Sequence, residues 1–458
     1  MHFNATTEDA LSRQADADEY GLSDYRGHHA NPDQRGRLAV IGQGYVGLPL
    51  SVRAAQAGYR CIGFDHDERR IALLREWISP IEDVSDDQIA AVSAADRYHP
   101  TARHEDLAGF DVAVIAVPTP LTAGVPDLSY VESAGRLVGK YLRPGALVIL
   151  ESTSYPGTTR TVLGRVLEEQ SGLTAGSDFH LGYSPERIDP GNPHHRLDNT
   201  PKLVSGVDEW SLRAAERFYT DLVAEVVTVG RCEEAELAKT IENTFRAVNI
   251  GLVNELAEIA HAAGIDFAAA MDAAATKPFG FMAFRPGTGV GGHCVPVDPM
   301  FLAWWARQQK TGKPSEMIEL ADRINRSRPA YVAERVTQLL AEAGRAVAGA
   351  RILLLGLAYK PGTGDLRESP AREVARLLYA SGATVRAADP MVSDLEAVAL
   401  DGIALVDANE DEAAAADVVV LATAHPAFDY AALVSSAATV LDCCGRLRGL
   451  GAQHVVQL

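Results

Sequence analysis

A strand, a glycine-rich turn and a helix follow one another without a gap in residues 37–55. Arg37-Leu-Ala-Val-Ile41 is an apolar β-type run, Gly42-Gln-Gly44-Tyr-Val-Gly47 comes next, and apolar residues at helical spacing continue to Ala55. In such a unit the first glycine permits the turn, the second lets the backbone approach a pyrophosphate, and the third lets helix and strand pack closely. The pattern therefore predicts an open parallel sheet with a dinucleotide at the helix N-terminus.

The residue after the second predicted strand bears on the choice of dinucleotide. That strand, residues 59–64, ends in Asp65, where a carboxylate can accept the ribose hydroxyls of NAD and repel the 2′-phosphate of NADP. His66 and Arg70 follow, so cationic help for a 2′-phosphate stays open. We predict NAD, in contact with these residues: Gly42, Gly44, Tyr45, Val46, Gly47, Asp65 and Arg70.

Two further apolar runs, at 111–117 and 146–150, predict strands of the same sheet. Each is followed by a polar or proline-rich loop. Ligands of open parallel sheets bind at the carboxyl ends of the strands, so Val117, Thr119 and Ser152 are expected to line the cofactor cleft. Alternatively, Thr119 and Thr153 are only turn residues at strand ends.

A polar loop at residues 183–192 offers several carboxylates. Among them, Glu186 could activate a water molecule if it faces the cleft. The alternative is an exposed loop glutamate that is only solvated.

The stretch from Cys232 to Ala263 contains one glycine, Gly251, and no proline. It predicts a long amphipathic helix that ends at Gly264. Because the helix is longer than one small domain needs, we expect it to join two domains and hypothesise that it packs against a copy of itself. The apolar stripe of this helix steps by four and three: Ile241, Phe245, Val248, Leu252, Leu256 and Ile259.

Lys239 and Asn243 lie one turn apart on this predicted helix, on a face turned away from the apolar stripe. One substrate could therefore meet an ammonium and a carboxamide side by side. A solvated polar face is the alternative interpretation of such a pair.

Residues 287–299 read Gly-Thr-Gly-Val-Gly-Gly-His-Cys-Val-Pro-Val-Asp-Pro. The glycines permit positive φ and close approach of a ligand, and they lead to a thiol, Cys294. A thiolate is a nucleophile, and Asp298 supplies a carboxylate four residues on, so Cys294 is a candidate for covalent catalysis. The alternative is a buried cysteine beside a tight turn.

Residues 351–441 repeat the plan of strand, loop and helix. Apolar runs at 351–355, 383–388, 417–421 and 439–441 predict strands of a second doubly wound sheet. Its first loop carries Lys360 and Arg367 in place of the glycine motif, which favours an anionic ligand other than the dinucleotide. Exposed basic residues on a turn are the alternative.

The net charge of -19 argues against nucleic acid or an anionic membrane surface as a partner, because both would repel the molecule. No run approaches the roughly 20 apolar residues of a membrane span, and no signal peptide is evident. The five cysteines show no paired spacing, which predicts neither disulfides nor a metal site and favours a cytoplasmic location. Residues 1–36 are polar and acidic, so we expect a flexible tail.

Six motifs resemble, in order, the signatures of the UDP-glucose/GDP-mannose dehydrogenase family, from about residue 37 to the C-terminus. They are Gly42-Gln-Gly-Tyr-Val-Gly-Leu-Pro-Leu50, Glu151-Ser-Thr-Ser-Tyr-Pro-Gly-Thr-Thr159, Ser184-Pro-Glu186, Glu236-Leu-Ala-Lys239 with Glu242-Asn-Thr-Phe-Arg-Ala247, Gly291-Gly-His-Cys294, and Tyr359-Lys-Pro361 with Asp365-Leu-Arg-Glu-Ser-Pro370.

The resemblance implies an α/β chain in which two doubly wound Rossmann-like domains are joined by a long central helix and a helical dimerisation domain. We place the NAD-binding domain at 37–230, the central domain with the cysteine loop at 231–330 and the UDP-sugar-binding domain at 331–458. The implied assembly is a homodimer or a dimer of dimers.

The resemblance also implies a four-electron oxidation of C6 of a nucleotide sugar to a carboxylate with NAD. Carried over by motif, Cys294 would be the nucleophile, Lys239 and Asn243 would stabilise the oxyanion, and Asp298 would orient Lys239 and water. Glu186 and Thr153 would position the hydrolytic water, and Arg367 would reach the cofactor. The implied contacts of the UDP-sugar are Arg285, Gly287, Gly289, Gly291, Tyr359 and Lys360.

One departure bears on the substrate. Members that oxidise UDP-glucose commonly carry a lysine directly before the aspartate of this loop, where this chain has Val297 before Asp298. The loop looks more like the branch that oxidises UDP-N-acetylhexosamines, notably UDP-N-acetylglucosamine, with UDP-glucose, UDP-N-acetylmannosamine and GDP-mannose as alternatives. Rival functions are a two-electron dehydrogenase that stops at the aldehyde and a non-catalytic nucleotide-sugar sensor.

Overall fold

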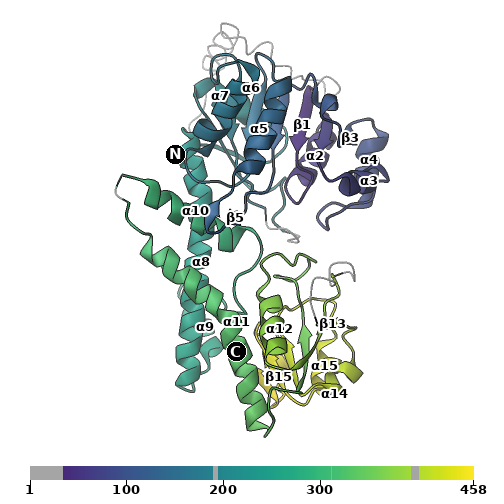
Figure 1. Cartoon of the computed structure of the whole chain (residues 1–458), viewed down its shortest axis with the longest axis vertical. Helices are drawn as coiled ribbons and strands as arrows, with labels where there is room; N and C mark the ends of the chain where they lie inside the picture. Colours follow the sequence, from purple (N-terminus) through teal and green to yellow (C-terminus); the bar gives the residue numbers. More distant parts are fainter. Residues whose placement is uncertain (1–34, 189–193, 311, 393–401) are drawn as a thin grey trace. The chain divides into compact units, whose positions relative to one another are not determined.

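Figure 1 shows the computed structural model, which describes residues 35–188, 194–310, 312–392 and 402–458. The chain divides into two compact units, Met1–Thr240 and Ile241–Leu458, and each contains a large, mostly parallel sheet. The boundary falls inside helix α8 (Cys232–Ala262). The tail expected at 1–36 lies almost wholly outside the described residues. No helix of the described ranges is long and apolar enough to span a membrane.

The first unit contains an eight-stranded sheet with the order β10-β9-β8-β7-β4-β1-β2-β3. Neighbouring strands are parallel except for β8 and β9, which are antiparallel. The strands predicted near 37, 59, 111 and 146 are confirmed as β1, β2, β4 and β7. The bounds are β1 (Arg37–Ile41), β2 (Arg60–Phe64), β3 (Tyr98–Thr101), β4 (Val112–Ile115), β7 (Leu147–Leu150), β8 (His180–Tyr183), β9 (Lys202–Gly206) and β10 (Val226–Thr228).

Alternate residues of each strand pack into the two cores on opposite faces of this sheet. In β1, Leu38 and Val40 join one core, and Ala39 and Ile41 join the other. Four helices supply the first core: α2 (Gly47–Gln56), α3 (Glu68–Arg75), α4 (Asp86–Ala94) and α7 (Glu209–Thr220). The second core takes α5 (Ser129–Tyr141), η4 (Thr159–Gly164), α6 (Arg165–Ser171) and the start of α8. Small elements complete the unit: η3 (His104–Leu107) and the hairpin of β5 (Leu121–Thr122) and β6 (Val125–Pro126).

The second unit begins with the helical part of the chain. The long helix predicted from Cys232 is confirmed as α8, and Gly264, just after it, has the left-handed φ of 64° that favours glycine at a helix end. After α9 (Phe267–Ala275), helix α10 (Cys294–Gln308) starts at the predicted nucleophile, and α11 (Glu316–Glu342) leads to the second sheet.

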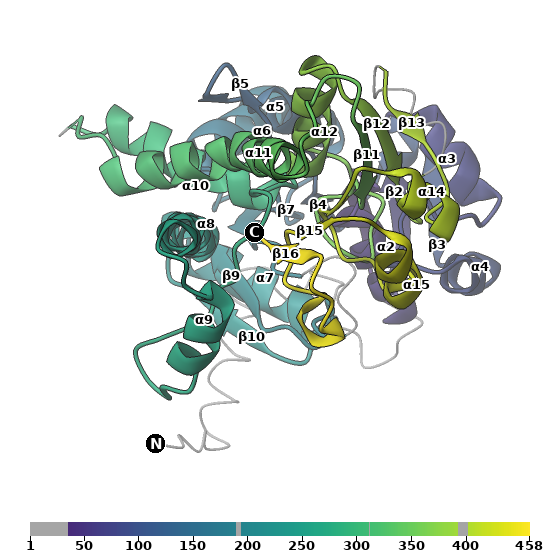
Figure 2. The same ribbon diagram turned by 90° about the horizontal axis from the view of Figure 1, so that it is seen from below.

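The second sheet has six parallel strands in the order β13-β12-β11-β14-β15-β16, the order of a dinucleotide-binding sheet. Helices α11 and α12 (Pro370–Ala380) supply one of its cores, and α14 (Glu410–Ala415) and α15 (Tyr430–Ser436) supply the other, as Figure 2 shows. The prediction of a second doubly wound domain is confirmed. The strands are β11 (Arg351–Leu355), β12 (Thr384–Ala388), β13 (Ala404–Leu405), β14 (Val418–Leu421), β15 (Val440–Asp442) and β16 (Val455–Gln457), with η5 (Arg448–Leu450) before the last.

Candidate active site

The glycine turn after β1 has the shape that a pyrophosphate requires. Gly42 has a φ of 96°, and a Cβ atom there would overlap the carbonyl oxygen of Ala116. A Cβ on Gly47 would overlap the carbonyl oxygen of Gly42, whereas one on Gly44 would meet no atom within 4 Å. The open space lies over Gly44, before the N-terminus of α2, where backbone N–H groups favour an anion. The turn therefore fits the phosphates of a dinucleotide.

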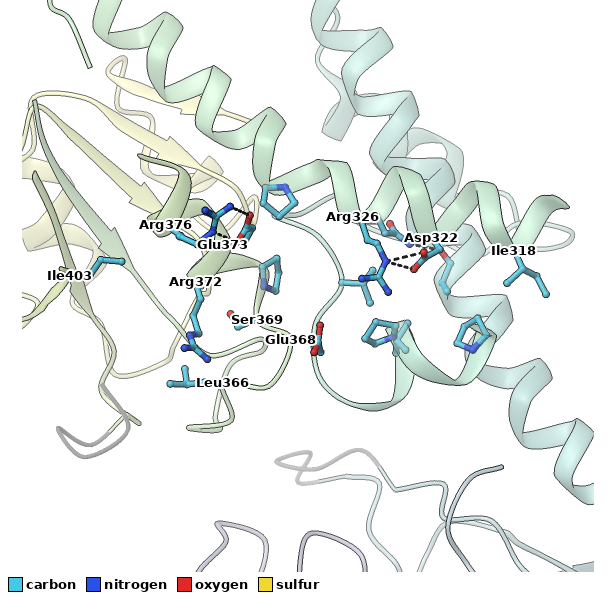
Figure 3. Close-up of a pocket in the computed structure, with 18 residues that line it drawn as sticks. Ile318, Asp322, Arg326, Leu366, Glu368, Ser369, Arg372, Glu373, Arg376 and Ile403 are labelled. Carbon is cyan, nitrogen blue, oxygen red and sulfur yellow. Dashed lines mark hydrogen bonds and ion pairs between the residues drawn. The ribbon is translucent and has the colours of Figure 1, made fainter. Parts of the chain in front are cut away.

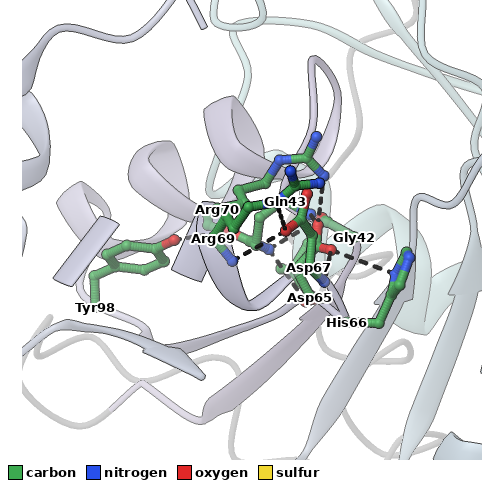
Figure 4. Close-up of polar contacts among 10 residues, drawn as sticks. Gly42, Gln43, Asp65, His66, Asp67, Arg69, Arg70 and Tyr98 are labelled. Carbon is green, nitrogen blue, oxygen red and sulfur yellow. Dashed lines mark hydrogen bonds and ion pairs between the residues drawn. The ribbon is translucent and has the colours of Figure 1, made fainter. Parts of the chain in front are cut away.

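Asp65 closes this turn from the end of β2 (Figure 4). Its Oδ2 accepts the Gln43 backbone N–H at 2.8 Å and Arg70 Nη1 at 2.9 Å, and its Oδ1 accepts the Asp67 N–H at 3.0 Å. A carboxylate has about four acceptor sites, so roughly one stays available for a ribose hydroxyl. Because Arg70 is paired with Asp65, its charge is already partly neutralised before any cofactor phosphate approaches.

Sequence reasoning missed the role of Gln43, the residue between the first two glycines. Its side chain is fully buried beneath the turn, where Nε2 donates to the carbonyl oxygens of Val40 at 3.2 Å and Gly42 at 3.0 Å. The Tyr98 hydroxyl donates to Gln43 Oε1 at 2.8 Å. These bonds fix the turn from inside. The variable position of a glycine motif carries no signal for such a role.

Ser152, predicted to line the cofactor cleft, ties two loops at the sheet edge together. Its Oγ donates to the Val117 carbonyl oxygen at 2.7 Å and lies 2.9 Å from the Val117 backbone nitrogen, which donates to it. Thr119 is buried, at 3% exposure, and Thr153 is half-buried. The carboxyl ends of β4 and β7 are thus joined, as the strand-end rule anticipates.

Glu186 lies just after β8 and is already bound on both carboxylate oxygens. Its Oε1 accepts the backbone N–H groups of Arg187 at 2.6 Å and Ile188 at 2.8 Å. Its Oε2 accepts Lys202 Nζ at 2.9 Å. The side chain keeps 11% exposure, so it is neither a solvated loop residue nor fully enclosed. Part of its loop, 189–193, lies outside the described residues.

The start of α8 is fixed by a glutamate that sequence reasoning did not single out. Glu236 is fully buried and accepts Thr159 N at 2.8 Å and Thr159 Oγ1 at 2.7 Å, besides the Gly157 N–H. Burial raises the pKa of Glu236 to about 7, although these bonds oppose the shift. Lys239 follows one turn later, so the glutamate anchors the helical segment from which Lys239 projects.

Lys239 and Asn243 do not form a solvated face, because their exposures are 7% and 5%. Asn243 Nδ2 donates to Asp298 Oδ2 at 2.5 Å. Asp298 is 1% exposed and lies on α10, one turn after Cys294, so both side chains share a face of that helix. The structure thus brings Cys294, Asp298 and Asn243 together, with Lys239 one turn before Asn243 on α8.

Cys294 is the first residue of α10, and it is exposed. The first turn of a helix presents backbone N–H groups and the positive end of the helix dipole, which favour negative charge on sulfur. The neighbouring His293 adds no charge at neutral pH, because burial and the Arg367 guanidinium lower its pKa. A buried cysteine beside a turn is therefore not what the structure shows.

The glycines before Cys294 serve packing within the second unit. A Cβ on Gly291 would lie 2.7 Å from Tyr359 Cβ and 2.8 Å from Pro370 Cδ, and Gly289 has a φ of 136°. Gly287 is held at both ends of its peptide, because its N–H donates to Asn254 Oδ1 at 3.1 Å and its carbonyl accepts Arg328 Nε at 3.2 Å. The loop is rigidly seated against the predicted substrate residue Tyr359.

Arg285, expected to contact the nucleotide sugar, and Arg367, expected to reach the cofactor, each pair with an aspartate. Arg285 Nη2 lies 2.5 Å from Asp272 Oδ1. The Arg285 residue also lines a cavity of about 270 Å³, together with Pro286, Cys443 and Gly445. Arg367 makes two side-chain contacts with Asp365 Oδ2, at 3.0 Å through Nε and 2.6 Å through Nη2. Both arginines are about half exposed, so a ligand could compete for them.

A larger cavity of about 660 Å³ borders the back of the cysteine loop (Figure 3). Four of its charged side chains form two pairs, Arg326 with Asp322 on α11 and Arg376 with Glu373 on α12. None of the predicted site residues lines it. In the described part of the chain, no cluster of three His, Cys, Asp or Glu could hold a metal ion.

Comparison with known proteins identifies the family. Three models of the UDP-glucose/GDP-mannose dehydrogenase family match in order: the NAD binding domain at 36–223, the central domain at 233–327 and the UDP binding domain at 353–448. A UDP-N-acetyl-D-glucosamine 6-dehydrogenase of Pseudomonas aeruginosa is 39% identical over 86% of this chain and 91% of its own length. A UDP-N-acetyl-D-mannosamine dehydrogenase of Pyrococcus horikoshii is 38% identical over 86% of this chain and 90% of its own.

Solved structures of the same family also match this chain. The structure of the Pyrococcus horikoshii UDP-N-acetylmannosamine dehydrogenase matches with a TM-score of 0.81 at 36% identity, covering 89% of this chain and 95% of that one. A UDP-glucose dehydrogenase from Pyrobaculum islandicum matches with a TM-score of 0.81 at 28% identity, covering 94% of this chain and 99% of that one. The chain belongs to the UDP-glucose/GDP-mannose dehydrogenase family and is an NAD-dependent UDP-sugar dehydrogenase.

Proposed function

We propose that the chain oxidises C6 of a UDP-N-acetylhexosamine, UDP-N-acetylglucosamine first among them, to the uronic acid through a thioester on Cys294. The observation that carries this proposal is the exposed thiol at the start of α10, one helical turn from the buried Asp298–Asn243 hydrogen bond of 2.5 Å. A nucleophile beside a carboxamide donor is the arrangement that acyl chemistry needs.

Two molecules of NAD⁺, bound one after the other at the glycine turn, would each accept one hydride, so one alcohol, one water and two NAD⁺ give one carboxylate, two NADH and three protons. After the alcohol has become an aldehyde, the carbonyl carbon can lose a second hydride only if a nucleophile makes it tetrahedral. The Cys294 thiolate adds to that carbon, and the resulting oxygen takes up a proton to give a thiohemiacetal. Loss of hydride and proton leaves a thioester, and water cleaves it to the acid and the free thiol.

The other site residues have separate roles in this reaction. Lys239 and the Asn243 carboxamide stabilise the oxyanion, and Lys239 exchanges protons with it. Asp298 orients Asn243 through their hydrogen bond, and we extend its role to Lys239 and water. Glu186 and Thr153 position the hydrolytic water. Arg285, Tyr359, Lys360 and the loop glycines hold the UDP-sugar, and Arg367 reaches the cofactor.

The choice of N-acetylglucosamine rests on the form of the cysteine loop. The identities of 39% and 38% to glucosamine- and mannosamine-type relatives do not separate the two epimers. A purified-enzyme NADH assay across UDP-N-acetylglucosamine, UDP-N-acetylmannosamine, UDP-glucose and GDP-mannose is expected to give the highest kcat/KM for the first. A higher value for any other sugar overturns the substrate, because pockets separate such isosteres only modestly.

The same assay decides between the rival functions. Two NADH per sugar consumed supports oxidation to the acid, whereas one NADH per sugar supports an enzyme that stops at the aldehyde. No NADH from any of these substrates, with UDP-sugar binding retained, supports a non-catalytic sensor.

We also propose a homodimer formed through α8. Five of the six residues of the predicted apolar stripe are exposed on the single chain, Ile241 53%, Phe245 47%, Leu252 49%, Leu256 39% and Ile259 60%, and Val248 is half-buried. A contiguous apolar face of this kind marks an interaction surface, and a second copy offers the same stripe for burial. A further pairing into a dimer of dimers is compatible with it.

Sedimentation of a Leu256→Glu, Ile259→Glu variant tests the dimer. The wild type is expected to sediment as a dimer at micromolar concentration and the variant as a monomer, because each copy would bury like charges against its partner. Leu73→Glu, at a 41% exposed leucine on α3, is the matched control and should stay dimeric. A monomeric wild type contradicts the proposal.

The proposal also includes the domain limits and the cellular location. We propose domain limits of 37–230, 231–330 and 331–458. The location is cytoplasmic, which is supported by the five cysteines, all free in the structure and therefore suited to a reducing compartment.

A further inference from the structure

A buried charged cluster lies behind Glu186. Its other members come from separate segments of the first unit: Glu151 directly follows β7, Lys202 begins β9, and Tyr219 lies on α7. The antiparallel pairing of β8 with β9 brings Lys202 beside the loop that carries Glu186. That loop is fastened to β9 by Ser184 Oγ, which donates to the Leu203 carbonyl oxygen at 2.7 Å.

Lys202 is shared between two carboxylates. Its Nζ lies 2.8 Å from Glu151 Oε1 and 2.9 Å from Glu186 Oε2. The Tyr219 hydroxyl donates to Glu151 Oε1 at 2.5 Å, and Lys202 Nζ lies 5.2 Å from the centre of the Tyr219 ring. Side-chain exposure is 2% for Lys202 and 0% for Glu151, against 11% for Glu186. Glu186 is therefore the more exposed of the two carboxylates in this cluster.

The contacts of Glu186 leave part of its hydrogen-bonding capacity unused. Two backbone N–H groups take Oε1 and the ammonium takes one site on Oε2, so about one of the roughly four acceptor sites of the carboxylate remains. While the carboxylate is ionised, both oxygens act only as acceptors and the remaining site can take a hydrogen bond from water, whereas protonation would turn one oxygen into a donor.

The charges around Glu186 favour its ionised form. Burial would raise the pKa of Glu186, but Lys202 and the backbone N–H groups of Ile188 and Arg187 outweigh it, and the pKa is lowered. Burial raises the pKa of Glu151. The positive charge of Lys202 opposes this rise, and the negative charge of Glu186 adds to it. The groups that face Glu186 are thus Lys202 of β9, Glu151 after β7, Tyr219 of α7 and its own loop amides.

We propose that Lys202 is a positioning residue for the hydrolytic half of the reaction, holding Glu186 ionised and oriented so that its remaining acceptor site takes a hydrogen bond from the attacking water. The proposal rests on the proposed function, because Glu186 has this role only if a thioester forms. Lys202 itself touches neither substrate nor cofactor. Glu151 compensates the rest of the ammonium charge, which allows the lysine to be buried.

The test separates hydrolysis from oxidation by stopped-flow NADH formation. With saturating UDP-N-acetylglucosamine and NAD, an initial burst of NADH reports the oxidations, and the later steady rate reports hydrolysis in a variant where hydrolysis is slow. For wild type, the steady rate should show no acid limb above about pH 5, since Glu186 stays ionised there. In Lys202→Met the ionised carboxylate loses its cation, its pKa rises, and an acid limb should appear about one to three pH units higher.

Four companion variants keep the result decisive. Glu186→Gln should slow the steady rate and show no such limb, which assigns the limb to Glu186. Lys202→Arg keeps the cation and should restore the wild-type profile. If Lys202→Met does not fold, Lys202→Met with Glu151→Gln removes both charges of the buried pair and should show the same limb. Lys140→Met, at an exposed lysine of α5, should behave as wild type.

A folded Lys202→Met, or the folded double variant, with a burst and a pH profile like wild type overturns the role of Lys202. In that case the cluster only supports the β8–β9 pair. A wild type that forms no burst and no sugar acid instead overturns the proposed function, so the two failures are distinguishable.

Discussion

A Cys294→Ser protein is expected to form the uronic acid at less than about a thousandth of the wild-type rate. A serine hydroxyl at the start of α10 has the same place on the helix but is far less ionised than a thiol, so it is a much weaker nucleophile. The first oxidation does not need the nucleophile. The variant should therefore release one NADH per sugar and accumulate an aldehyde that an alkoxyamine traps.

Cys61→Ala is the matched control for loss of a thiol. Cys61 is buried in β2, and burial raises the pKa of its thiol, so it stays protonated and should be dispensable for turnover. Acid formation by Cys294→Ser at the wild-type rate would end the covalent mechanism. Loss of the first oxidation as well, in a folded protein, would mean that the thiol contributes to substrate binding.

Lys239→Ala is expected to lower kcat by about 10²–10⁴-fold while the Kd for NAD changes little. The ammonium is 7% exposed and lies one turn from Asn243, so its removal takes away both a proton donor and a positive charge at the developing oxyanion. Stopped-flow NADH formation measures the chemical step, and NAD fluorescence titration measures the Kd.

Lys140→Ala serves as the control, because Lys140 is an exposed lysine on α5. A variant at position 239 that loses NAD affinity and keeps kcat would place the ammonium in the cofactor pocket rather than at the reacting carbon.

The variant Asn243→Asp tests the neighbouring carboxamide. It would oppose Asp298 across 2.5 Å with a like charge, and we expect it to lose activity as well.

The regular elements were largely predictable because their signals are local. Apolar runs located β1, β2, β4 and β7 of the first sheet and β11, β12, β14 and β15 of the second, and the unbroken helical stripe located α8. The glycine motif predicted its own geometry, because a Cβ on Gly42 or Gly47 would overlap backbone and Gly44 borders open space. The antiparallel β8–β9 pair was not predicted, since its pairing joins residues distant in sequence.

The candidate site was predictable only at the level of residue types. Asn243 and Asp298 are 55 positions apart, and no spacing rule indicates their hydrogen bond. The loop glycines were expected to approach a ligand, whereas Gly291 approaches Tyr359 and Pro370. Residues with no chemical signal of their own, such as Gln43, Glu236 and Lys202, proved to hold the predicted ones in place, and such support depends on tertiary contacts.

Intact-peptide mass spectrometry on acid-quenched enzyme examines the thioester itself. Glu186→Gln, expected to slow hydrolysis, is mixed with UDP-N-acetylglucosamine and NAD and quenched after the NADH burst. The covalent mechanism predicts a peptide that contains Cys294 and carries the uronyl group of the UDP-sugar, in an amount equal to half the NADH formed in the burst. A burst of two NADH per site with acid already released and an unmodified Cys294 peptide would contradict it.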